Sequence, residues 1–259
     1  MLAWIVRGLR GGRITTAYPR RAEPAPPGFR GRVQVLEGAG DGGAAAACPT
    51  GAIVAGPGGR LTLDRGRCIL CGDCVRAAPD RFAFEARYET AARSRLGLVE
   101  GGERLDAAVE PLRRTLGERA GALRRSIHIR HIDCGSDGGE EWEIQALWNP
   151  YYDIQRLGFF LTAAPRHADI LLVTGAVTSA MRLPLVRTWE VMPEPKALVA
   201  VGTDACSGGL SAAGTLTAGG VDEVLAVDVY VPGSPPAPIA IMHGLLLATG
   251  VLTAEAVLA

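Results

Sequence analysis

Apolar and polar residues follow strand-like patterns in four short runs in the second half of the chain. These runs are SIHIRHID (126–133), ADILLVTG (168–175), KALVAVGT (196–203) and DEVLAVDVYV (222–231). Between them lie stretches that we predict to be helices, at about 140–148, 153–163, 178–192 and 236–250. Apolar strands that alternate with helices indicate a parallel sheet covered on both faces. Ligands of such sheets bind at the carboxyl ends of the strands.

The first half of the chain has a different pattern. Residues 1–32 are rich in Arg, Pro and Gly and predict an extended arm. Residues 33–100 contain short apolar pieces and turns, and the piece RLTLD (60–64) alternates like a small strand. Residues 101–125 predict a connecting helix, with apolar residues at roughly helical spacing over 103–125. The parallel sheet then occupies 126–259.

Charge divides the chain at the same place. Residues 1–125 hold 21 of the 27 basic and 13 of the 27 acidic residues, so this half carries about +8 and the remainder about −8. The asymmetry suggests two modules with different surfaces, and the zero total gives no indication of nucleic-acid binding. No stretch has the length and composition of a signal peptide or a membrane span, so we expect a cytoplasmic protein.

Four of the six cysteines have the spacing of an iron–sulfur motif. Cys68, Cys71 and Cys74 form a C-x-x-C-x-x-C run, and Cys48 stands upstream in a Cys-Pro pair. In two-cluster bacterial ferredoxins each run reads C-x2-C-x2-C-x3-C-P, and its fourth cysteine ligates the other cluster. On that pattern Cys48 completes the ligand set of Cys68, Cys71 and Cys74.

The second ligand set of the same motif is absent. Its four positions fall on Gly38, Asp41, Ala44 and Ala78. One set is therefore complete and the other is wholly missing, which predicts one 4Fe–4S cluster in residues 33–100. A zinc site is the chemical alternative, because thiolates also form tetrahedral zinc sites. Three cysteines within seven residues, together with the Cys-Pro pair, favour the cluster.

The first module resembles the ferredoxin-like subunits of formate hydrogenlyase and related respiratory complexes. The resemblance includes GLRGGRITTAYP (8–19) and GFRGR (28–32), which are similar to the N-terminal segment of those subunits. It implies a small α+β ferredoxin-like domain with an arm that lies along partner subunits.

The second module resembles the small subunit shared by group 4 NiFe hydrogenases and the respiratory NADH:quinone oxidoreductase. The similar stretches are PYYDIQRLGFF (150–160), PRHADILLVTGAVT (165–178), PEPKALVAVG (193–202), GGVDEVLAVDVYVPG (219–233) and PPAPIAIMHGLL (235–246). The resemblance implies a flavodoxin-like, doubly wound parallel sheet that docks on a large subunit and holds a 4Fe–4S cluster.

The cysteine ligands that this resemblance implies for the cluster are missing from the sequence. Their positions are occupied by Asp137, Glu140, Asp204 and Ser234. Carboxylates are poor substitutes for thiolates at iron–sulfur clusters, so we expect this cluster to be absent. The vacated pocket could be open to water, filled by an arginine, or occupied by a hard divalent cation. Trp142 and Trp148 are interpreted as packing residues close to it.

The resulting hypothesis is an electron-transfer subunit of a hydrogenase-like or complex I-like oxidoreductase. It would carry one cluster in the first module and lie peripherally on the inner face of the cell membrane, bound through large and membrane subunits. We see no set of catalytic residues, so the chain alone is not expected to be a complete enzyme. The alternative is a scaffold or regulatory subunit of such a complex, without a redox role.

Overall fold

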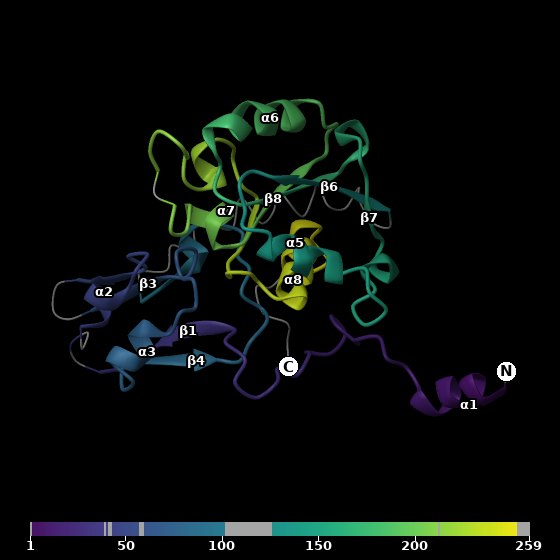
Figure 1. Ribbon diagram of the computed structural model, residues 1–259, viewed down its shortest axis with the longest axis horizontal. Helices are drawn as coiled ribbons and strands as arrows, with labels where there is room; N and C mark the ends of the chain where they lie inside the picture. Colours follow the sequence, from purple (N-terminus) through teal and green to yellow (C-terminus); the bar gives the residue numbers. More distant parts are fainter. Residues whose placement is uncertain are drawn as a thin grey trace.

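The computed structural model describes residues 2–38, 40, 43–56, 60–101, 126–211 and 213–252. Within these ranges the chain forms one large parallel sheet with its helices, two small antiparallel sheets and an N-terminal arm (Figure 1). The predicted connecting helix at 101–125 falls almost wholly outside the described residues. No helix in the described part is long and apolar enough to cross a membrane.

The large sheet confirms the predicted parallel arrangement. Its strands are β6 (Ile127–Asp133), β7 (Phe159–Leu161), β8 (Ile170–Thr174), β9 (Ala197–Val201) and β10 (Val229–Val231). They lie side by side in the order β10-β9-β8-β6-β7, and every pairing is parallel. Read in chain order this is 5-4-3-1-2, the strand order of flavodoxin-like folds.

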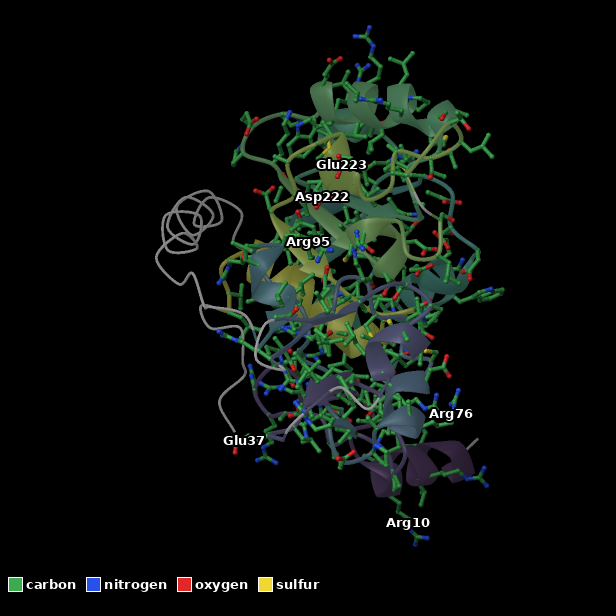
Figure 2. The ribbon with its side chains drawn as sticks, turned by 90° about the vertical axis from the view of Figure 1, so that its left-hand side faces the viewer. Arg10, Glu37, Arg76, Arg95, Asp222 and Glu223 are labelled. Carbon is green, nitrogen blue, oxygen red and sulfur yellow. The ribbon has the colours of Figure 1, made fainter. Side chains whose placement is uncertain are left out.

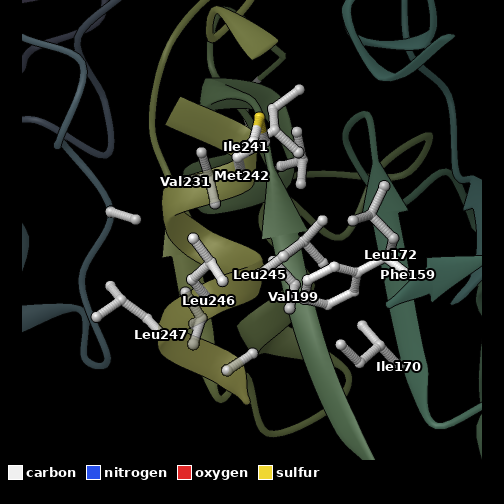
Figure 3. Packing of buried hydrophobic residues seen from close by; sticks show 14 of the residues in the cluster. Phe159, Ile170, Leu172, Val199, Val231, Ile241, Met242, Leu245, Leu246 and Leu247 are labelled. Atoms are coloured by element: carbon white, nitrogen blue, oxygen red, sulfur yellow. The ribbon is translucent and has the colours of Figure 1, made fainter. Parts of the chain in front are cut away.

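Both faces of the sheet are covered, as its apolar strands require. Helices α5 (Gly139–Ala146) and α8 (Pro238–Ala248) lie on one face, and α6 (Ser179–Glu190) lies on the other (Figure 1). Along β8 the side chains alternate between two cores, so Ile170 and Leu172 face α8 while Leu171 and Val173 face α6. Figure 3 shows the first of these cores, where α8 packs on β8 and β9.

The prediction of a helix at 153–163 is wrong. The structure has a 3₁₀ turn at Ile154–Leu157 followed by β7, the edge strand of the sheet. Asp153 and Gly158 both adopt positive φ angles, of 42° and 87°, which interrupt a helix on either side of the turn. Phe159 is then free to pair with Ile127 and to bury its ring in the core.

Two smaller differences concern the ends of the other strands. The run 222–231 begins with a 3₁₀ turn at Val221–Glu223, and only its last three residues form β10. A short helix, α7 (Thr203–Ser207), follows β9 and was not predicted. It turns the chain at the carboxyl edge of the sheet, where Asp204 and Cys206 lie.

The first module consists of short strands and helices around a small core of its own. Strand β1 (Arg32–Val35) pairs with β4 (Phe82–Glu85), while β3 (Leu61–Asp64) pairs with β2 (Ile53–Ala55) and β5 (Val99–Glu100); all pairings are antiparallel. The predicted strand at 60–64 is therefore confirmed as β3. The short helices are α2 (Ala44–Ala47) and α3 (Asp73–Ala77), and a 3₁₀ turn spans Leu96–Leu98.

The arm departs from the prediction over its first ten residues. Leu2–Gly11 form helix α1, because Leu2, Ile5, Val6 and Leu9 recur at helical spacing ahead of the Gly11-Gly12 pair. Residues 12–31, between α1 and β1, contain no helix or strand. Tyr18 is fully buried in the α8-side core of the sheet. The arm therefore packs on the second module of its own chain.

The two modules also contact each other directly at the carboxyl edge of the sheet. Thr203 Oγ1 donates a hydrogen bond of 3.0 Å to the carbonyl oxygen of Cys68. Arg95 lies 3.8 Å from Asp222, and Figure 2 shows the two side chains beside each other. The cysteine motif of the first module is thus held against the edge at which ligands of such sheets bind.

Candidate functional site

The structure brings the four motif cysteines together around one cavity. Cys48 follows α2, Cys68 and Cys71 lie in the loop before α3, and Cys74 is on α3. All four line the same cavity. The apolar part of its wall comes from the core of the first module and includes Val33, Ala52, Ile53 and Leu63.

Two positive φ angles shape the loop that carries three of these cysteines. Leu70 has a φ of 57° and Gly72 a φ of 84°. A Cβ at Gly72 would lie 3.1 Å from the ring of Phe84. Both the positive φ angle and the limited space therefore favour glycine at this position. These turns allow residues 68, 71 and 74 to face one cavity although they are close together in the sequence.

The electrostatics of the cavity disfavour free thiolates. The pKa of Cys68 is raised to about 12, chiefly by burial and to a smaller extent by the neighbouring Cys74, Cys48 and Cys71. Burial likewise raises the pKa of Cys74, with Cys71 and Cys48 adding to the effect. Four thiolates in one cavity therefore need a compensating positive charge, and bound iron would supply it.

Backbone N–H groups also point at the sulfur atoms. The amide of Ala52 donates to Cys48 Sγ at 3.2 Å, and the amides of Leu70 and Val75 favour the thiolate forms of Cys68 and Cys74. Four thiols, apolar walls and amide donors are the environment in which iron–sulfur clusters are held. The residues present therefore fit a 4Fe–4S cluster. Among the described residues, no group of three or more His, Cys, Asp or Glu side chains is arranged to hold a metal ion.

An arginine packs against Gly38, one of the positions of the missing second ligand set. Ala44 and Ala78 are buried in the core, while Asp41 lies outside the described residues. A Cβ at Gly38 would lie 2.7 Å from Cδ of Arg81. The buried guanidinium of Arg81 donates to the carbonyl oxygens of Leu36 and Gly40. Nothing in the sequence pattern indicated this role for Arg81.

The four vacated positions of the second module also gather at one place. Asp137 and Glu140 lie at the start of α5, Asp204 is on α7, and Ser234 follows β10. The charges of Asp137 and Asp204 both raise the pKa of Glu140. Ser234 joins them between Gly233, which accepts from the amide of Thr203, and Pro235, which lies beside Gly139.

Glu140 is the buried member of this carboxylate group. The residue is only 3% exposed, and its Oε2 has no hydrogen-bond partner in the described part of the chain. Burial, followed by the charges of Asp137 and Asp204, raises its pKa to about 7. A Cβ at Gly202 would lie 2.3 Å from Oε1 of Glu140, and Gly202 has a φ of 93°. Glycine at this position is what allows the carboxylate to pack against the backbone.

The remaining cysteines and histidines lie apart from both groups. Cys134 and Cys206 are fully buried in the α6-side core, where burial raises the pKa of each thiol. His243 is fully buried in α8, and burial lowers its pKa to about 3. His131 Nε2 lies 3.0 Å from Thr174 Oγ1, with which it can form a hydrogen bond.

The interpretation of Trp142 as a packing residue is wrong, because 73% of it is exposed. It lies two positions after Glu140 on α5, and residues at that spacing point to different sides of a helix. Trp148 is half-buried against the α8-side core, so it does pack as expected.

Comparison with known proteins gives a consistent family. Residues 138–248 match the family of the NADH ubiquinone oxidoreductase 20 Kd subunit. Formate hydrogenlyase subunit 7 of Escherichia coli (strain K12) is 44% identical over 130 residues, which cover 50% of this chain and 51% of that protein. The probable membrane-bound hydrogenase subunit mbhJ of Pyrococcus furiosus is 41% identical over 126 residues, which cover 49% and 75%.

One solved structure with a related chain is that of the membrane-bound sulfane sulfur reductase, an archaeal respiratory membrane complex. It shows 29% sequence identity and a TM-score of 0.44, covering 51% of this chain and 75% of that chain. The chain spans about half the length of its formate hydrogenlyase relative.

The strand order and the packing of the second module define a flavodoxin-like α/β protein with a candidate site at the carboxyl edge of its sheet. Through this region the chain belongs to the NADH:ubiquinone oxidoreductase 20 kDa subunit family. Its relatives include subunits of membrane-bound hydrogenase and of NADH-quinone oxidoreductase.

Proposed function

We propose that this chain is an electron-transfer subunit of a membrane-associated, hydrogenase-like or complex I-like oxidoreductase. It would bind one 4Fe–4S cluster through Cys48, Cys68, Cys71 and Cys74 in a ferredoxin-like module of residues 33–100. The observation that carries this proposal is the single cavity lined by all four of these cysteines. Its partners would be a large subunit and membrane subunits, which would hold it on the inner face of the cell membrane.

Each part of the cavity has a distinct role in this proposal. The four thiolates would hold the cluster, the apolar wall would keep water away, and the amides of Ala52, Leu70 and Val75 would donate to sulfur. A cluster bound there would accept and release one electron at a time. The carbonyl of Cys68 accepts from Thr203, which ties the ligand loop to the second module.

The second module would serve as the docking part. Its own ligand positions carry Asp137, Glu140, Asp204 and Ser234, none of which supplies sulfur. The nearest cysteines, Cys134 and Cys206, are buried in an apolar core. This supports the proposal that the family's cluster is absent here. The same observation favours a second candidate function, in which the whole chain is a non-redox scaffold or regulatory subunit.

Electron paramagnetic resonance of the anaerobically purified protein, together with an iron count, separates these possibilities. One reducible cluster per chain would support electron transfer through the first module. Two clusters would contradict the assignment of the vacated positions. No cluster, after attempted reconstitution with iron and sulfide, would favour the scaffold.

A further inference from the structure

Arg30, at the end of the arm, lies against the loop that carries three of the motif cysteines. Its Nη1 atom donates to the carbonyl oxygen of Leu70 at 3.4 Å and to that of Cys71 at 3.3 Å. A Cβ at Gly72 would lie 3.7 Å from the same nitrogen atom. The guanidinium therefore covers three consecutive residues of the turn that precedes α3.

The chain on both sides of Arg30 is held against the first module. Phe29 packs on Tyr88, with 4.6 Å between the ring centres. A Cβ at Gly31 would overlap the carbonyl oxygen of Arg87, so only glycine allows the two backbones to pass this closely. Strand β1 follows at once and pairs with β4. These contacts fix the backbone from which the arginine reaches the ligand loop.

The positive charge of Arg30 has no paired carboxylate. Its Cζ atom lies 4.9 Å from the centre of the Phe84 ring, which supports the guanidinium by a cation–π contact. Arg76 donates to the same Cys71 carbonyl at 3.4 Å, but it forms an ion pair with Asp73. Within the described part of the chain, no ion pair involves Arg30. Its charge is therefore not offset by an adjacent negative group.

We propose that Arg30 raises the reduction potential of the cluster that Cys48, Cys68, Cys71 and Cys74 would bind. The inference rests on the proposed function, because it assigns a positioning residue to that site. A cluster gains one negative charge when it accepts an electron. A fixed positive charge beside the ligand loop therefore favours the reduced form, and the two hydrogen bonds keep that charge in place.

Solvent limits the size of this effect. Arg30 is exposed, and dissolved salt screens exposed charges over about 8 to 10 Å. We expect its charge to change the equilibrium constant for reduction by about three- to tenfold. A tenfold change corresponds to about 59 mV for one electron. The contribution should become smaller as the salt concentration rises.

The test is a redox titration of the full-length chain after anaerobic reconstitution, followed by electron paramagnetic resonance. Arg30→Gln and Arg30→Met remove the charge, and the long side chain of methionine can still pack on Phe84. Arg30→Lys keeps the charge and serves as the conservative variant. Arg187→Gln is the matched control, since it removes a positive charge from the exposed face of α6. Iron content and melting temperature are measured for every variant.

We expect the midpoint potential to fall in both neutral variants, by the amount that corresponds to a three- to tenfold weaker reduction. Arg30→Lys and Arg187→Gln should stay within about twofold of the wild type on the same scale. The difference between the wild type and Arg30→Gln should shrink when the titration is repeated at high salt.

Three results would overturn the inference. One is a neutral variant that has the iron content of the wild type and also its midpoint potential. Another is an Arg30→Lys variant whose potential falls as far as that of Arg30→Gln, because charge would then not be the cause. The third is loss of the cluster from both neutral variants, which would make Arg30 a requirement for binding instead. A wild-type chain that takes up no cluster would contradict the proposed function itself.

Discussion

Seven side chains form the two candidate groups: the four motif cysteines, and the carboxyl groups of Asp137, Glu140 and Asp204. Burial raises pKa values in both groups. Thiols at Cys68 and Cys74 and the carboxyl of Glu140 all have raised pKa values, because each lies in surroundings that disfavour its charged form. The two groups differ in the ligands that suit them. Soft thiolates are ligands for iron–sulfur clusters, whereas carboxylates are poor ligands for them.

The first residue-level prediction concerns the cluster ligands. The Cys48→Ser variant should bind less than half of the iron of the wild type, for which we expect about four iron atoms per chain. The hydroxyl replaces a soft thiolate at a position that no neighbouring cysteine can fill. Iron and sulfide analysis after anaerobic reconstitution measures this. Cys134→Ala is the matched control, since Cys134 lies in the α6-side core. Equal iron content in the two variants would contradict the ligand assignment.

The second residue-level prediction concerns pH. The pKa of Glu140 is about 7 in the folded chain and about 4.5 in the unfolded chain. Between these values the folded chain binds more protons, so stability falls as pH rises through this window, by about 3 kcal/mol at most. The Glu140→Gln variant lacks this contribution. Melting temperatures of the isolated chains at pH 5 and pH 8 should therefore fall more for the wild type than for the variant. An identical fall in both proteins would show that Glu140 does not titrate in this range.

Among the elements, α6 illustrates how a polar residue completes a helix end. The chain's single lysine, Lys196, is 9% exposed and lies just before β9. Its ammonium group donates to the carbonyls of Trp189 and Met192 at 2.8 and 3.2 Å, and it lies 4.5 Å from the centre of the Trp189 ring. These carbonyls lie at and just beyond the end of α6, where carbonyl groups have no N–H donor within the helix. The lysine therefore joins α6 to the start of β9.

Replacement of this lysine gives the element-level prediction. Lys196→Met keeps the length of the side chain but removes the charge and the donors. It should lower the free energy of unfolding by about 1–3 kcal/mol, because two carbonyl groups lose a charged donor. Thermal unfolding of the isolated chain measures the effect. Arg187→Gln on the exposed face of α6 is the control and should change stability by no more than about 0.5 kcal/mol. Similar losses in both variants would contradict the capping role.

At the scale of the whole molecule, the cysteine module and the large sheet meet at the carboxyl edge of the sheet, where α7 lies. Thr203 is central to this contact. It is fully buried, donates to the carbonyl of Cys68 at 3.0 Å, and accepts from the amide of Gly233 at 3.3 Å. On either side of it, Gly202 packs against the carboxylate of Glu140 and Asp204 raises the pKa of Glu140. The segment 202–204 therefore contacts both the loop that carries Cys68 and the buried Glu140.

The prediction at this scale is that Thr203 couples the two modules. Thr203→Val preserves the shape of the side chain but leaves the Cys68 carbonyl and the Gly233 amide without this partner. We expect a loss of about 1–3 kcal/mol in stability and faster release of iron to a chelator, because the ligand loop is less firmly held. Thr203→Ser keeps the hydroxyl group and should remain close to the wild type in both measurements. If Thr203→Val and Thr203→Ser behave alike, the hydroxyl does not couple the modules.

The sequence by itself determined the elements whose patterns are local. Strands β6, β8 and β9 and helices α5, α6 and α8 lie where apolar spacing predicts them, and the parallel sheet follows from their alternation. The spacing of Cys68, Cys71 and Cys74 predicted that these three lie together, because the loop that joins them is short. The addition of Cys48 to the set came from the pattern of two-cluster ferredoxins. The positions 137, 140, 204 and 234 were predicted as one group only through a resemblance to a family.

Only the tertiary structure decided the features that depend on distant partners. Residues 153–163 have helical spacing, but the left-handed turns at Asp153 and Gly158 and the pairing of β7 with β6 override it. Arg81 donates to the carbonyl of Gly40, and Thr203 donates to the carbonyl of Cys68, across separations of 41 and 135 residues. The unpartnered oxygen of Glu140 is likewise a property of packing. Periodicity indicates which face of an element is buried. It does not indicate which distant group packs against that face. Both candidate sites depend on such contacts between residues that are far apart in the sequence.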